Sequence, residues 1–151
     1  MPTVTRARVV AAPPEAVWRL VSDPDRLPEW WPGVQRVEDV SPGAWTKVLV
    51  SPRGKTVRAD YSLVEAEGPR RLTWRQEVEE SPFERVLSES LTDIEIEEEP
   101  HDSAGTRVHL RARMRLRGFA RFGGLQIRRA TGRRLEAALD GLETALTGRE
   151  G

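Results

Sequence analysis

The order of apolar and polar positions predicts one strand, a short helical region, six further strands and a long closing helix. Residues 3–10 alternate and are rich in valine, as in a half-buried strand. Pro13 and Pro14 favour a helix start, because proline is tolerated in the first helical turn. Pro28 and Pro32 then limit a second helix to a turn or two.

After residue 33 the pattern changes to strand-like runs separated by turn signals rich in glycine, proline and serine. The runs are VQRVEDV, AWTKVLV, KTVRADYSLVEAE, RRLTWRQEV, FERVLSESLTDIEIEE and TRVHLRARMRLRG. Six runs with short connections predict an antiparallel meander. The last run alternates apolar residues with arginines and a histidine, which indicates one buried and one solvated face. Acids of the preceding run should lie across from these basic residues; they are Glu89, Asp93, Glu95 and Glu97.

The chain is expected to end in a helix over about residues 121–147, whose apolar stripe has helical spacing. The stripe consists of Thr131, Leu135, Ala138, Leu139, Leu142 and Leu146. The predicted fold is therefore α+β, with about seven antiparallel strands and a long C-terminal helix. The length suits one core, so residues 1–151 are expected to form one domain.

Composition excludes several function classes. Acidic and basic residues balance at 24 each, so no overall charge directs the chain to nucleic acid or a membrane. Cysteine is absent, which excludes disulfides and thiolate catalysis. No signal peptide, membrane span or metal-binding motif is recognisable, so we expect a cytoplasmic protein without a metal or cofactor.

Four segments of the chain resemble the SRPBCC superfamily: APPEAVWRLVSDPDRLPEWWPGVQRV, EGPRRLTWR, AGTRVHL and RRLEAALDGLETAL. The closest similarity is to its polyketide cyclase/dehydrase and lipid-transport group, which includes START-like proteins. The resemblance covers nearly the whole chain. It implies a helix-grip fold, in which a curved sheet holds the last helix with a cavity between them. The expected function is binding or transport of a small hydrophobic molecule such as a lipid, an isoprenoid or a polyketide.

The residues expected to line the cavity combine aromatic surface with a few polar groups, which suits a mostly apolar ligand. In the PEWWPG segment the resemblance implies a position near the cavity entrance, and we favour Trp30 over Trp31 as the lining residue. Strand parity adds inward candidates, although the phase of residues 83–97 is left open by a competing leucine face. The full predicted set is Trp30, Tyr61, Trp74, Gln76, Ser90, Thr92, Gly124 and Arg128.

Two alternatives to a binding protein remain open. An aromatase/cyclase-type enzyme would use Tyr61 as a proton donor and Arg58 to stabilise an enolate. Neither His101 nor His109 is expected on a cavity face, so neither is favoured as a general base.

The second alternative is a protein-interaction module that uses a basic face on the last helix. Nine arginines and no acid lie between residues 111 and 134. Four of them have no obvious acidic strand opposite and are candidates for an anionic partner; they are Arg128, Arg129, Arg133 and Arg134.

Overall fold

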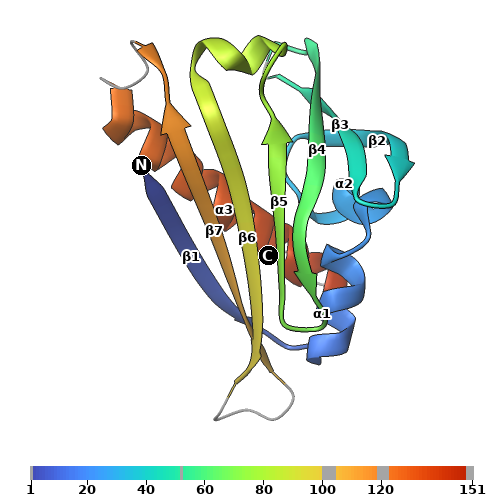
Figure 1. Cartoon of the computed structure of the whole chain (residues 1–151). Coiled ribbons are helices and arrows are strands. Elements are labelled where there is room, and N and C mark those ends of the chain that lie inside the picture. The colour runs from blue at the N-terminus through green and yellow to red at the C-terminus, as the bar shows by residue number, and fades with distance from the viewer. Residues whose placement is uncertain (1, 52, 100–104, 119–122, 149–151) are drawn as a thin grey trace.

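The computed structural model describes residues 2–51, 53–99, 105–118 and 123–148, and these form a curved sheet with helices on one side (Figure 1). The strands are β1 (Thr3–Val10), β2 (Val34–Ser41), β3 (Ala44–Val50), β4 (Thr56–Glu67), β5 (Arg71–Glu77), β6 (Leu87–Glu98) and β7 (Thr106–Leu116). The helices are α1 (Pro14–Val21), η1 (Pro24–Arg26), α2 (Leu27–Trp30), η2 (Pro82–Arg85) and α3 (Gly124–Thr147).

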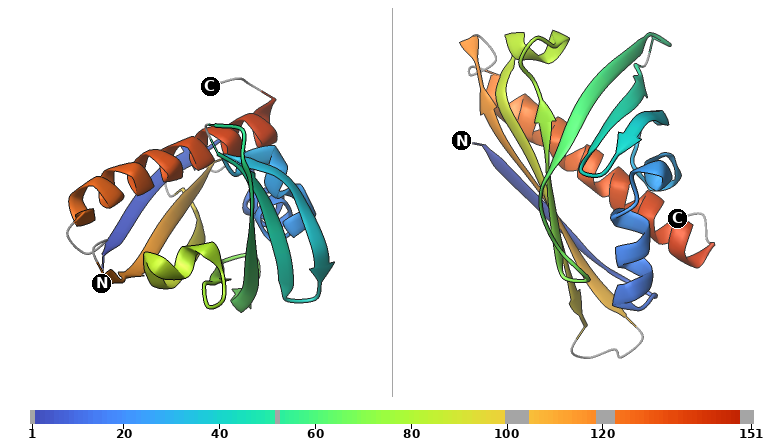
Figure 2. Two further views of the ribbon diagram at one scale, coloured as in Figure 1. Left: turned by 90° about the horizontal axis from the view of Figure 1, so that it is seen from above. Right: turned by 45° about the vertical axis from the view of Figure 1, so that its right-hand side comes forward.

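The sheet is antiparallel throughout, in the order β1-β7-β6-β5-β4-β3-β2. The first strand therefore pairs with the last, while β2 to β7 form the predicted meander. The sheet curves, and α3 crosses its concave side diagonally (Figures 1 and 2). The predicted α+β helix-grip fold is thus confirmed.

One expected strand segment is helical. The run from residue 83 was predicted to be extended, but Pro82–Arg85 form the short helix η2. Pro82 occupies the first helical position, and the Ser81 hydroxyl accepts a hydrogen bond from the Phe83 amide. A register shift follows between Leu87 and Glu89, after which β6 keeps one phase.

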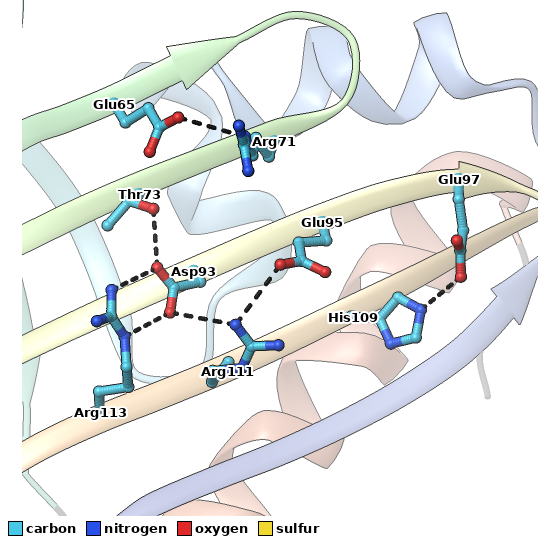
Figure 3. A network of polar contacts seen from close by, with 9 residues as sticks. All are labelled: Glu65, Arg71, Thr73, Asp93, Glu95, Glu97, His109, Arg111 and Arg113. Carbon is cyan, nitrogen blue, oxygen red and sulfur yellow. Dashed lines mark hydrogen bonds and ion pairs between the residues drawn. The ribbon is translucent and has the colours of Figure 1, made fainter. Parts of the chain in front are cut away.

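The convex face of the sheet carries the predicted ladder of charges (Figure 3). Its most buried member is Asp93, which accepts hydrogen bonds from the Thr73 hydroxyl at 2.8 Å and from Arg113 at 2.7 and 2.9 Å. His109 lies 2.8 Å from Glu97 on the same face. His109 therefore has the surface position that its parity predicted, whereas His101 lies outside the described residues.

The helix α3 closes the core by burying Leu135, Ala138, Leu139 and Leu142 against the sheet and α2. A Cβ atom on Gly141 would lie 2.3 Å from the carbonyl oxygen of Trp30. Backbone therefore touches backbone at this crossing, which only glycine permits.

An ion-pair cluster joins the other side of α3 to the first strand. Arg8 of β1 pairs with Glu136 and Asp140 of the helix. The first and last elements of the described chain are therefore held together.

Candidate ligand cavity

A cavity of about 580 Å³ lies between the concave face of the sheet and the N-terminal half of α3. Strands β3 to β7, η2 and the segment after α2 all contribute to its wall. The lining residues are Trp31, Pro32, Gly33, Lys47, Leu49, Val50, Ser51, Val57, Tyr61, Gln76, Phe83, Ser90, Thr92, Ala112, Met114, Thr131, Arg133, Arg134 and Leu135. The volume falls within the range of pockets that hold small organic ligands.

Four polar groups predicted from strand parity face this cavity: Tyr61, Gln76, Ser90 and Thr92. Strand pairing accounts for their convergence, since Tyr61 lies opposite Gln76 across β4 and β5. Likewise, Thr92 of β6 lies opposite Ala112 of β7. No side-chain hydrogen bond joins any of the four to another described residue. Their donors and acceptors are therefore available to a molecule inside the cavity.

Burial also affects the chemistry of Tyr61. It raises the pKa of the phenol to about 12, and the positive charge of Arg134 opposes this shift only in part. The phenol is consequently protonated at neutral pH and can donate a hydrogen bond.

The cavity wall contains a buried amine that the sequence interpretation missed. Lys47, in the middle of β3, is 1 % exposed. Its Nζ lies 4.2 Å from the ring centroid of Tyr61, 4.4 Å from that of Trp31 and 4.8 Å from that of Trp74. Among the described residues the amine has no hydrogen bond or ion pair. Three aromatic rings thus surround the amine, and no carboxylate of the described chain pairs with it.

Desolvation is the main cause of the lowered pKa of the Lys47 amine. Burial lowers the pKa of Lys47 well below its usual value, and the nearby charge of Arg134 lowers it further. The aromatic rings favour the ammonium form, but they do not replace the water or carboxylate that an ammonium ion normally requires.

An aromatic cluster stands between this cavity and a second one. Trp31 and Tyr61 line the larger cavity, while Trp45 and Trp74 line a smaller one of about 230 Å³. The rings are in contact across the boundary, since Trp31 and Trp74 have centroids 5.6 Å apart and Trp45 stacks on Tyr61 at 6.2 Å. Trp74 therefore faces inward as predicted, but it forms the partition between the cavities.

The two adjacent tryptophans have exchanged the positions that the sequence suggested. Trp30, at the end of α2, is 2 % exposed and packs under α3, so it does not line the larger cavity. Trp31 lines it instead. Trp31 is the residue that ends the helix, and successive residues of a helical turn project their side chains in directions about 100° apart. Their planes are accordingly inclined at 86°.

Three other predicted residues lie elsewhere. Gly124 and Arg128 belong to the first turns of α3, which lie at the sheet edge beside β1 and β7 (Figure 1). The helix reaches the cavity only one to two turns later, at Thr131 and Arg134. Arg58 pairs with Glu38 on the other face of β4 from Tyr61, so it cannot act on the same ligand.

The predicted basic face divides into two pairs. Arg128 and Arg129 are exposed and have no ion pair within the described chain, whereas Arg133 and Arg134 line the cavity mouth. An anionic partner for all four remains a prediction.

Strand register offered a signal for the missed lysine. Trp45, Lys47 and Leu49 share one parity, and they pair with Tyr61, Ala59 and Val57 of β4. Lys47 lies between two apolar residues on the inward face of β3, where a charged side chain is unusual. The small side chain of Ala59 opposite leaves room for it.

The described residues contain no group of histidine and acidic side chains able to hold a metal ion. Among the helices of this part of the chain, none has the length and apolar character required to cross a bilayer.

Comparison with known proteins agrees with this architecture. The model of the family described as polyketide cyclase/dehydrase and lipid transport matches residues 1–147. A search of the curated proteins found no match.

Solved structures share the fold over almost the whole chain. A START superfamily protein from Mycobacterium smegmatis is 14 % identical with a TM-score of 0.78, covering 97 % of each chain. A protein from Thermus thermophilus is 26 % identical with a TM-score of 0.75, covering 97 % of this chain and 98 % of that one. The di-domain ARO/CYC BexL of the BE-7585A biosynthetic pathway is 18 % identical with a TM-score of 0.77, covering 98 % of this chain and 50 % of that one.

Proposed function

The chain belongs to the polyketide cyclase/dehydrase and lipid transport family, and from this membership we propose that it binds or carries a small hydrophobic molecule in the larger cavity. The ligand would be a lipid, an isoprenoid or a polyketide-like molecule. The family and its START-like fold are those of hydrophobic-ligand binding.

The supporting observation is the composition of the cavity wall. Aromatic and aliphatic side chains provide most of its surface, and the polar groups of Tyr61, Gln76, Ser90 and Thr92 have no partner within the described chain. Such a wall suits a largely apolar molecule that has a few oxygen atoms. A core packed only for stability would satisfy these groups internally.

Native mass spectrometry of the protein purified from its own cells tests the proposal. We expect an additional mass that is released on denaturation, and binding of members of a lipid and polyketide-mimic screen. The matched variants are Ala112→Trp, which fills the cavity from β7, and Ala7→Trp, which places the same ring on the exposed face of β1. Binding that is retained by Ala112→Trp, or absent from the native protein in both experiments, would refute the proposal.

The second candidate function is an aromatase/cyclase-type reaction. It is favoured by the protonated and unpaired Tyr61 phenol at the cavity wall, which can donate a proton to an enolate. Tyr61→Phe should then abolish turnover of a poly-β-keto mimic while ligand binding remains. Arg58→Ala now serves as the control, because Arg58 lies outside the cavity. Equal turnover by Tyr61→Phe and the native protein would exclude this role.

A further inference from the structure

The choice of cation in the cavity is unusual for this sequence. Of 24 basic residues, 22 are arginine and only Lys47 and Lys55 are lysine. Lys55 lies exposed in the turn between β3 and β4, whereas Lys47 is the buried one. Lysine can lose its proton when it is desolvated, but arginine stays charged. The buried position thus carries the residue type that can exist without a counterion.

Cationic side chains on other faces of the molecule have the carboxylate partners that Lys47 lacks. On the convex face, Arg113 has the buried carboxylate of Asp93 at 2.7 Å. Arg8 on β1 likewise has Glu136 and Asp140. Among the described residues that line the cavity there is no aspartate or glutamate.

Further positive charge lies at the mouth of the same cavity. Arg133 and Arg134 line it from α3, and neither forms an ion pair within the described chain. Arg134 is near enough to influence both Lys47 and Tyr61. One side of a largely apolar cavity is therefore cationic, and the described part of its wall contains no compensating acid.

We propose that the ligand is an amphipathic carboxylic acid whose carboxylate binds between Lys47 and Arg134 while its apolar part occupies the rest of the cavity. This inference rests on the proposed binding function. Two donors from two elements match the two oxygens of a carboxylate. The carboxylate supplies the negative charge that the wall lacks, and the rings around Lys47 stabilise the ammonium that then forms.

Binding of the acid is coupled to proton uptake. The groups that face Lys47 are the guanidinium of Arg134 and the phenol of Tyr61, and none of the described residues that line the cavity has a carboxylate. In the empty cavity, burial favours the neutral amine, and the bound carboxylate favours the ammonium. At a pH between the pKa of Lys47 in the empty cavity and its pKa in the complex, binding of one ligand is accompanied by uptake of up to one proton. The affinity for the acid should therefore fall as pH rises.

Isothermal titration calorimetry with decanoic acid, methyl decanoate and decanol measures this preference. The variants are Lys47→Met, Lys47→Arg and, as control, Lys55→Met, each checked for native circular dichroism. We expect the native protein and Lys55→Met to prefer decanoate over the ester. Lys47→Met should bind decanoate at least about 30-fold more weakly, the lower range for removing one partner of a buried charge pair, and should no longer prefer the acid over the ester. Lys47→Arg should retain the preference without proton uptake.

Proton uptake is read from the binding enthalpy in buffers of different ionisation enthalpy. Equal affinity for acid and ester in the native protein would overturn the inference and leave the proposed function standing. Loss of decanoate binding that is the same in Lys55→Met and Lys47→Met would also overturn it. If none of the three probes, nor any member of the wider screen, binds the native protein, the proposed function itself fails.

Discussion

Replacing Gly141 with alanine tests the close contact between α3 and the end of α2. The added Cβ would meet the carbonyl oxygen of Trp30 at 2.3 Å and its carbonyl carbon and Cα at 3.0 Å. A carbon atom normally approaches a carbonyl oxygen no closer than about 3.3 Å. The helix and the segment that positions Trp31 must therefore separate by roughly 1 Å.

The expected cost follows from two opposing terms. Overpacking destabilises a fold by about 1–3 kcal/mol, and the upper part of this range, about 2–3 kcal/mol, applies here because a backbone atom cannot rotate away as a side chain can. Alanine regains about 1 kcal/mol of helix propensity relative to glycine. The net loss should be about 1–2 kcal/mol, which corresponds to a fall in melting temperature of roughly 2–8 °C for a chain of this size.

Gly132 of the same helix provides a matched control. Its added Cβ would lie 2.5 Å from a terminal nitrogen of Arg6, which is the movable end of an exposed side chain. Gly132→Ala should therefore be neutral or up to about 1 kcal/mol more stable. Urea unfolding followed by far-ultraviolet circular dichroism measures both variants. If Gly141→Ala proves as stable as the native protein or as Gly132→Ala, the contact with Trp30 does not limit helix packing.

Three further predictions concern buried polar groups. Lys47→Met should raise stability most at neutral pH and least near pH ~10. The pKa of Lys47 is lower in the folded than in the unfolded state, so the native protein loses stability as pH falls from the unfolded pKa to the folded pKa. Urea midpoints measured across this range test the prediction, and a difference between variant and native protein that does not change with pH would refute it. Ultraviolet titration of Tyr61, the only tyrosine, should give a pKa of about 12 in the folded protein and about 10 in urea; the folded state should accordingly lose stability above pH ~10, and a folded value near 10 would contradict its burial. Asp93→Ala should cost about 2 kcal/mol through its lost charged hydrogen bonds, against less than about 1 kcal/mol for the exposed Glu97→Ala, and equal losses in urea unfolding would refute the difference.

Strand alternation was sufficient to predict most of the sheet and part of the cavity. Parity decides which face a strand residue occupies, so Tyr61, Gln76 and Trp74 were all predicted inward. The phase of β6 was open because its leucines compete with its hydroxyl residues. The register shift after Leu87 resolves the competition by changing phase before Ser90.

The remaining errors arose where side-chain direction depends on tertiary geometry. The Trp30-Trp31 pair has no alternation to read, since the chain changes from helix to extended backbone between them. The position of α3 across the sheet is set by the Gly141 contact and the diagonal crossing, so helical spacing alone could not exclude Arg128 from the cavity. Lys47 was missed because the composition is dominated by 22 arginines, and a lysine becomes a candidate site residue only once its burial is known.

The tryptophan cluster also makes the cavity optically distinct from the rest of the protein. Four of the five tryptophans, Trp30, Trp31, Trp45 and Trp74, form a chain of ring contacts with centroids 5.3–6.4 Å apart. At such separations excited states are shared between indoles, which gives exciton bands in near-ultraviolet circular dichroism and rapid energy transfer in emission. Trp18 lies apart, against the Gly68 turn. A ligand that tilts one ring of the cluster will therefore change a collective signal, and its arrival can be followed in time without any label.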